Sequence, residues 1–114
     1  MEDKAINAVA GLLGIARRAG RLSTGFDAVC AQIGEGKAEL VLLACDLSEK
    51  TGKELRYAAR DRKLSAIRLP LDKETISRAL GLKKPVGVLA LTDKGFADAV
   101  RRQCRDEIEE VTAL

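Results

Sequence analysis

The sequence predicts an α/β fold, a three-layer α-β-α sandwich in which about five helices cover a four-stranded mixed sheet. The first observation behind this prediction is that segments with helical spacing of apolar residues alternate with short apolar runs. The second is that the runs at 40–45 and 86–91 are almost continuously apolar, as in strands covered on both faces. With 114 residues, 46% of them hydrophobic, residues 1–114 are expected to form a single domain with one core.

The first half of the chain predicts two helices and two strands in alternation. Glycine ends each helix, because this residue readily adopts the left-handed conformation that follows a helix. The predicted elements are a helix from about 6 to 16 ended by Gly20, a strand at 21–24, a helix from Asp27 to about Ile33 ended by Gly34 and Gly36, and a strand at 39–45.

The second half continues the same alternation. Acidic or hydroxyl residues stand where helix N-caps are needed: Asp27 before the second helix, Asp46 or Ser48 before the third, Asp72 before the fourth and Asp93 before the fifth. The predicted elements are a helix reaching about Lys63, a strand at 65–69 ended by Pro70, a short helix from Asp72 to Leu80 ended by Gly81, a strand at 86–91, and a last helix from Asp93 through Ile108.

Side chains that commonly carry catalysis are missing or poorly placed. The chain has no histidine, and its three cysteines are far apart, so they are expected to be small buried residues kept reduced. The stretch GEGK at 34–37 resembles part of a phosphate loop, but it follows a helix and precedes a strand, which is the reverse of the required order. We therefore expect a protein without enzymatic activity, metal or cofactor.

The charge distribution is compatible with a nucleic-acid partner, and a solvated surface would show it as well. The net charge is +3, and the last nine residues, DEIEEVTAL, hold four acids and no base, so the rest of the chain is more basic. Apolar runs are too short to span a bilayer and the N-terminus does not resemble a secretory signal, which predicts a cytoplasmic protein. Only three aromatic residues, Phe26, Tyr57 and Phe96, are present, so if the chain binds RNA, it is expected to recognise a folded shape rather than an extended single strand.

Two stretches carry a resemblance to a known family. LLGIARRAGRLSTGFDAVCAQIGEGKAELVLLACDLSEKT at 12–51 and ALTDKGFADAV at 90–100 closely resemble the bacterial YlxQ-type ribosomal-protein-like family. That family belongs to the kink-turn RNA-binding superfamily, which includes the large-subunit ribosomal proteins seven-A-e and thirty-e. The resemblance covers about residues 12 to 100 and implies the same α-β-α fold.

The resemblance also implies where RNA binds. In the superfamily, a glycine at the position of Gly25 lets RNA approach the backbone, and a motif like Asn-Glu-x-x-Lys follows it. This sequence departs from that motif, with Asp27, Ala28 and Ala31 at its three positions. A second contact comes from the loop at 81–85. The residues implied to contact RNA are Arg21, Thr24, Gly25, Phe26, Asp27, Lys37, Leu82, Lys83, Lys84 and Pro85.

Two hypotheses about function follow. In the leading one, the protein binds structured RNA without catalysis, with ribosomal RNA and ribosomal or translation proteins as candidate partners and with neither DNA nor membrane. In the alternative, the chain is a protein-interaction module that kept the fold and lost most specific RNA contacts, because Ala28 and Ala31 make the helix face smaller and less polar. For Phe26, packing on RNA and anchoring the helix in the core remain equally open.

Overall fold

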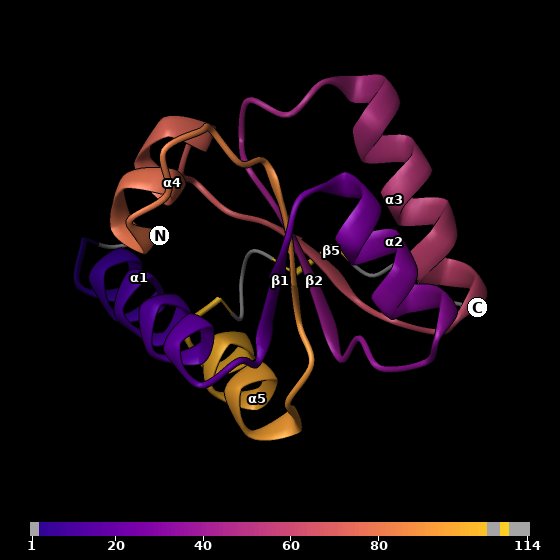
Figure 1. Cartoon of the computed structure of the whole chain (residues 1–114), viewed down its shortest axis with the longest axis horizontal. Coiled ribbons are helices and arrows are strands. Elements are labelled where there is room, and N and C mark those ends of the chain that lie inside the picture. Colours follow the sequence, from indigo (N-terminus) through magenta and orange to yellow (C-terminus); the bar gives the residue numbers. More distant parts are fainter. Residues whose placement is uncertain (1–2, 105–107, 110–114) are drawn as a thin grey trace.

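The fold was obtained as a computed structural model, which describes residues 3–104 and 108–109. Helices α1, α4 and α5 cover one face of a central sheet, and α2 and α3 cover the other, so the predicted three-layer sandwich is confirmed (Figure 1). The helices are α1 (Asp3–Arg18), α2 (Phe26–Gly34), α3 (Glu49–Asp61), α4 (Lys73–Leu80) and α5 (Lys94–Gln103). The strands are β1 (Leu22–Thr24), β2 (Leu40–Leu43), β3 (Ala66–Arg68), β4 (Val88–Leu91) and β5 (Ile108–Glu109).

The sheet is mixed, as predicted, with strand order β1-β4-β2-β3-β5. Strands β2 and β3 are parallel, and every other neighbouring pair is antiparallel. Four strands match the predicted ones, and the two-residue β5 is an addition on the β3 edge. We call the end of the sheet where β1, β2 and β3 finish and β4 begins the Gly25 end, and the opposite end the Arg21 end.

The core is divided by the sheet into two apolar clusters. In β2, Leu40 and Leu42 face α1, α4 and α5, whereas Val41 and Leu43 face α2 and α3. Strand β4 alternates in the same way. All eight residues of β2 and β4 are buried, which confirms that the continuous apolar runs belong to strands covered on both faces.

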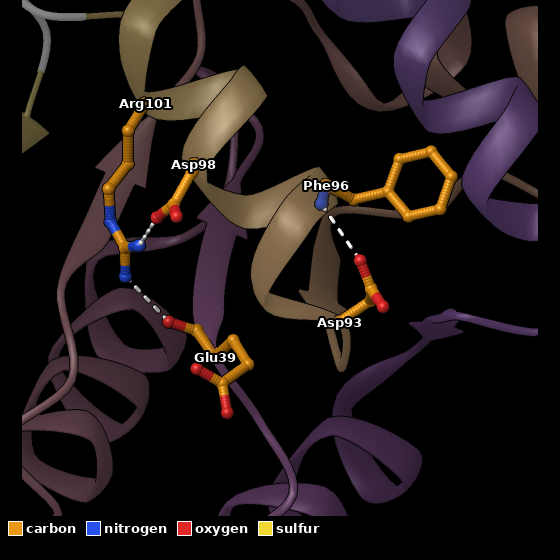
Figure 2. A network of polar contacts seen from close by, with 5 residues as sticks. All are labelled: Glu39, Asp93, Phe96, Asp98 and Arg101. Carbon is orange, nitrogen blue, oxygen red and sulfur yellow. Dashed lines mark hydrogen bonds and ion pairs between the residues drawn. The ribbon is translucent and has the colours of Figure 1, made fainter.

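Three of the predicted N-caps are present. Ser48, Asp72 and Asp93 accept hydrogen bonds from the backbone N–H groups of Thr51, Thr75 and Phe96, respectively (Figure 2 shows the last). Of the two candidates before α3, Ser48 is therefore the cap, whereas Asp46 accepts from the N–H of Lys73 at 3.0 Å. Hydrogen bonds from Thr75 lower the pKa of Asp72, with a smaller contribution from the positive charge of Arg78.

A side-chain bridge also fixes α5 against the sheet (Figure 2). The guanidinium of Arg101 donates to the backbone carbonyl of Glu39 at 2.7 Å and contacts the Asp98 carboxylate at 2.9 Å. Glu39 immediately precedes β2, and its own N–H donates to Leu91 at the end of β4. Arg101 thus connects α5 to the two central strands at the Arg21 end.

Two of the predicted helix boundaries were wrong. Asp27 does not cap α2: Gly25 occupies the N-cap position, because its φ of 96° and ψ of 155° start the helix at Phe26, and Asp27 lies in the first turn. The last helix does not extend to Ile108 but ends at Gln103. Ile108 instead pairs with Ile67 of β3, where pairing between strands gives hydrogen-bond partners to the backbone groups at the edge of the sheet.

The acidic end of the chain lies mostly outside the described residues, which include only Glu109 of its four acids. Within residues 3–104 and 108–109, no helix has both the length and the apolar character needed to cross a lipid bilayer.

Candidate functional site

The candidate site lies where β1 passes into α2 at the Gly25 end of the sheet. The N–H of Gly25 donates to the carbonyl of Val88, the first residue of β4, at 2.9 Å. This bond places the chain before β4 beside the start of α2, although the two segments are about sixty residues apart in sequence. We call residues 24–28 together with 81–87 the Gly25 surface.

Gly25 has a backbone conformation that is almost exclusive to glycine. At φ 96° and ψ 155° a side chain would be strained, because this region is sterically disfavoured for residues with a Cβ. Space is not the reason, since a Cβ built at Gly25 would meet no atom within 4 Å. The residue therefore turns the chain and also leaves the space in front of its backbone open.

Unpaired donors follow the glycine. The N–H of Gly25 is occupied by Val88, and the N–H of Val29 bonds back to the carbonyl of Gly25. Within the described part of the chain, the N–H groups of Phe26, Asp27 and Ala28 have no hydrogen-bond acceptor. A helix N-terminus with free N–H groups attracts anions such as phosphate, because the groups carry partial positive charge.

The side chains on this turn of α2 point to solvent. Phe26 is 39% exposed and belongs to neither apolar cluster, which favours a contact role over an anchoring role for its ring. Asp27, Ala28 and Ala31 are exposed as well. The three positions that the resemblance maps onto the Asn-Glu-x-x-Lys motif thus form a solvent-facing patch with one carboxylate and two methyl groups.

The loop opposite Gly25 is fixed by one buried side chain. Ser77 of α4 is 5% exposed; its hydroxyl donates to the carbonyl of Lys84 at 2.8 Å and accepts from the N–H of Val86 at 2.7 Å. Leu82 and Val86 pack partly against the apolar cluster under α4. Lys83, Lys84 and Pro85 remain exposed. The loop therefore presents its two lysines from a fixed backbone.

A third lysine lies close to the same loop and was not predicted. A Cβ built at Gly87 would lie 3.0 and 3.1 Å from two side-chain carbons of Lys73 and 2.9 Å from Leu47. The absence of a side chain at Gly87 thus leaves room for these two side chains. The sequence places Lys73 after the Asp72 cap, but only the tertiary contact with Gly87 shows that α4 begins close to the chain entering β4.

Arg21 and Lys37 are not brought to the Gly25 surface. Arg21 precedes β1, and its backbone carbonyl accepts a hydrogen bond from the N–H of Thr92, which follows β4. Lys37 lies near the start of β2, with its ammonium 3.4 Å from Glu35. Both residues are at the Arg21 end, separated from Gly25 by about 10 Å of strand. Of the predicted contact residues, the other eight lie on the Gly25 surface.

The cysteines differ in their surroundings. Cys104 is buried and Cys30 is partly buried, as expected, but Cys45 is exposed because it lies beyond the covered part of β2. Burial, followed by the negative charges of Asp27 and Glu54, raises the pKa of the Cys30 thiol. Cys30 therefore stays protonated at neutral pH, which does not suit a nucleophile.

Comparison with known proteins gives a family that agrees with this arrangement. Residues 7–101 match the ribosomal protein L7Ae/L30e/S12e/Gadd45 family. The chain belongs to this family. The match includes every element from β1 to β4, and hence both segments of the Gly25 surface, so the resemblance found in the sequence is confirmed at the level of family.

Two curated relatives of this L7Ae-family chain carry the same name. The RNA-binding protein YlxQ of Enterococcus faecium is 36% identical over 95 residues, which cover 83% of this chain and 85% of the relative. The RNA-binding protein YlxQ of Bacillus subtilis (strain 168) is 34% identical over 87 residues, which cover 76% of this chain and 85% of the relative.

Solved structures show the same L7Ae-family fold. A protein of unknown function from Bacillus halodurans superimposes with a TM-score of 0.79 at 26% identity, covering 85% of this chain and 96% of the other. The 15.5kD RNA binding protein of Giardia lamblia superimposes with a TM-score of 0.77 at 18% identity, covering 94% of this chain and 90% of the other. At the latter identity, the likeness establishes the fold alone.

Substituting Gly25 by alanine is expected to lower the free energy of unfolding by about 1–3 kcal/mol, because the new Cβ is strained at this φ and ψ. Gly34→Ala is the matched control: its Cβ also meets no atom within 4 Å, but its φ is ordinary, so this change is expected to stabilise by up to about 1 kcal/mol. Urea unfolding measures both. Equal effects of the two substitutions would contradict the conformational role of Gly25.

Ser77→Ala is expected to cost about 1–3 kcal/mol of stability, because the Lys84 carbonyl and the Val86 N–H lose their shared partner in a partly buried position. Arg78→Ala, on the next residue, removes only an exposed ion pair with Glu74 and is expected to cost less than about 0.5 kcal/mol. The comparison is made by chemical denaturation. If Ser77→Ala unfolds at the same urea concentration as the parent chain, the hydroxyl does not hold the loop.

Proposed function

We propose that this protein binds structured RNA through the Gly25 surface, without catalysis, and that the preferred RNA is a sharply bent element of the kink-turn type. One observation carries the proposal: three unpaired N–H groups at the start of α2 follow Gly25, which bonds to Val88 at the end of a fixed loop that exposes Lys83 and Lys84. Two relatives more than 30% identical over most of the chain are named RNA-binding proteins, which supports RNA as the ligand.

Each part of the surface has a ligand group that it suits. The N–H groups of Phe26, Asp27 and Ala28 fit a phosphate or an acceptor on a base edge. Lys83 and Lys84 add charge for further phosphates, and the exposed ring of Phe26 offers a face for a base or ribose. A bent RNA brings phosphates and base edges together in one place, so it suits a surface built from two adjoining segments.

The motif positions on α2 set the expected strength of binding. Ala28 and Ala31 cannot contact a base edge or a phosphate, and Asp27 adds negative charge. A good base-edge contact contributes about 1–3 kcal/mol of discrimination on the scale for duplex grooves. With two or three such contacts missing, affinity depends more on backbone donors and lysines. We expect binding that is weaker and more salt-dependent than the full motif would give.

A second candidate function rests on the same patch. Ala28 and Ala31 expose methyl groups on one side of α2, and such a surface suits a protein partner, with ribosomal or translation proteins as candidates. In that case the chain uses the face of α2 for protein contact and not for RNA. In the leading proposal, by contrast, the target is ribosomal RNA or a similar structured RNA, and the protein is located in the cytoplasm.

The leading proposal predicts tighter binding to a kink-turn RNA than to a plain duplex of equal length and charge. Filter binding over a series of salt concentrations separates shape preference from charge, because a nonspecific complex shows a steep salt slope without preference. Equal affinity for the two RNAs at every salt concentration would defeat the kink-turn proposal. Co-purification of a protein partner that persists after nuclease treatment would favour the second function.

Removing the loop charges is expected to weaken RNA binding more than removing charges at the other end of the sheet. Lys83→Ala with Lys84→Ala lowers the salt slope by up to about 2, because each phosphate contact contributes about 0.9. Arg21→Ala with Lys37→Ala removes the same charge from the Arg21 end and serves as the matched control. Affinity and salt slope are measured for both double variants. An equal loss in the two would show that only net charge matters.

A further inference from the structure

We propose that the outer face of α3 is a second RNA-contact site, where Tyr57 stacks on a base of a single-stranded segment and Lys50, Lys53 and Arg60 contact its phosphates. The site rests on RNA binding as proposed above but adds a different class of RNA structure and a surface outside the Gly25 surface. We call these four residues the α3 stripe.

The starting observation is the exposure of a large aromatic ring. Tyr57 is 67% exposed, the highest value among the large apolar side chains of the described residues. The opposite side of α3 is buried through Gly52, Leu55 and Ala59, so the helix is oriented with Tyr57 outward. A tyrosine that contributes little to the core is available to a ligand, and its face can stack on any of the bases.

Helix geometry places three cations beside the ring. Lys50, Lys53, Tyr57 and Arg60 are spaced by three, four and three residues, which aligns them along one side of α3. All three cations are exposed, and none forms an ion pair or a side-chain hydrogen bond within residues 3–104 and 108–109. The stripe therefore keeps its positive charge for a ligand.

Two carboxylates are close to the ring and must be considered. Glu54 and Asp61 stand three residues before and four residues after Tyr57. Glu54 acts electrostatically on Cys30 of α2, so it lies on the flank of α3 that faces α2. In helical projection Lys53 and Arg60 lie on the other flank of Tyr57 from these acids, whereas Lys50 lies close to the line of the ring, so a strand that avoids the acids would follow Lys53 and Arg60 past Tyr57.

The position of α3 allows one RNA to reach both surfaces. Helices α2 and α3 pack side by side on the same face of the sheet (Figure 1), and α3 begins after β2 finishes at the Gly25 end. Tyr57 lies nine residues beyond Ser48, about 13 Å along the helix axis. A few nucleotides of single strand span such a distance. An RNA of this form has a bent element with an unpaired extension.

Charge and ring together favour RNA over a protein as the occupant. A protein interface core is depleted in lysine, whereas phosphate backbones are bound by lysine and arginine beside aromatic stacking platforms. One tyrosine with three unpaired cations matches the second pattern. If a protein partner occupied this face instead, the experiment below would find no contact between RNA and Tyr57.

The chain itself supplies a probe for this site. Tyr57 is the only tyrosine, and there is no tryptophan, so the intrinsic fluorescence excited near 280 nm arises from Tyr57. Stacking on a base quenches this emission. We expect quenching by a kink-turn RNA carrying a ten-nucleotide single-stranded extension and by the unstructured ten-nucleotide strand alone, and little quenching by the same kink-turn RNA with blunt ends. Absence of quenching by either extended or single-stranded RNA would overturn the proposal.

Affinity measurements on variants complete the test. In the parent chain the extension should tighten binding by about 5- to 150-fold, the range for stacking of one base. Tyr57→Ala should remove the part of this gain that stacking supplies, Tyr57→Phe should keep it, and Lys4→Ala, which removes an exposed cation on α1, should leave it unchanged. An equal gain in Tyr57→Ala would refute the α3 site. Loss of kink-turn preference with retained Tyr57-dependent binding of the single strand would defeat the proposed function and leave the α3 site standing.

Discussion

The hydrogen bond from the N–H of Gly25 to the carbonyl of Val88 is the contact on which the candidate site depends. It forms where the chain leaves β1 with a positive φ, and it joins the first segment of the site to the loop that enters β4. Without this turn, α2 would start with a different orientation, and its free N–H groups would not follow the residue that contacts the start of β4. A single backbone conformation thus determines both the fold of the junction and the surface it presents.

The remaining supports act from beneath the surface. Ser77 fixes the backbone of the 81–87 loop, and Gly87 admits the side chains of Lys73 and Leu47 against the chain just before β4. Neither Ser77 nor Gly87 needs to touch a ligand, yet each acts on a segment that would. A surface held in this way binds with a small loss of conformational entropy, which suits recognition of a defined shape.

The fold was largely predictable because local signals and the global arrangement agree. The continuous apolar runs of β2 and β4 and the caps at Ser48, Asp72 and Asp93 each indicated the element that formed. Predictions failed where a tertiary effect prevailed. A glycine conformation displaced Asp27 from the cap, and pairing with β3 took Ile108 out of the last helix.

The site was predictable only in part, because closeness in sequence does not show at which end of a strand a residue lies. Arg21 is four residues from Gly25 in sequence but lies at the opposite end of β1, and Lys37 accompanies it. Conversely, Lys73 is placed near the site only by its tertiary contact with Gly87, and the α3 stripe only by the orientation of its helix. The direction in which each strand runs decides which charges share a surface.

The exposure of Ala28 and Ala31 has a consequence for how such a protein changes over time. Both side chains lie outside the two apolar clusters that hold the sandwich together. Replacing them alters what α2 offers to a ligand while the packing that sustains the scaffold is untouched. Ligand preference and scaffold integrity can therefore diverge independently, and one architecture can serve many targets through a few solvent-facing substitutions.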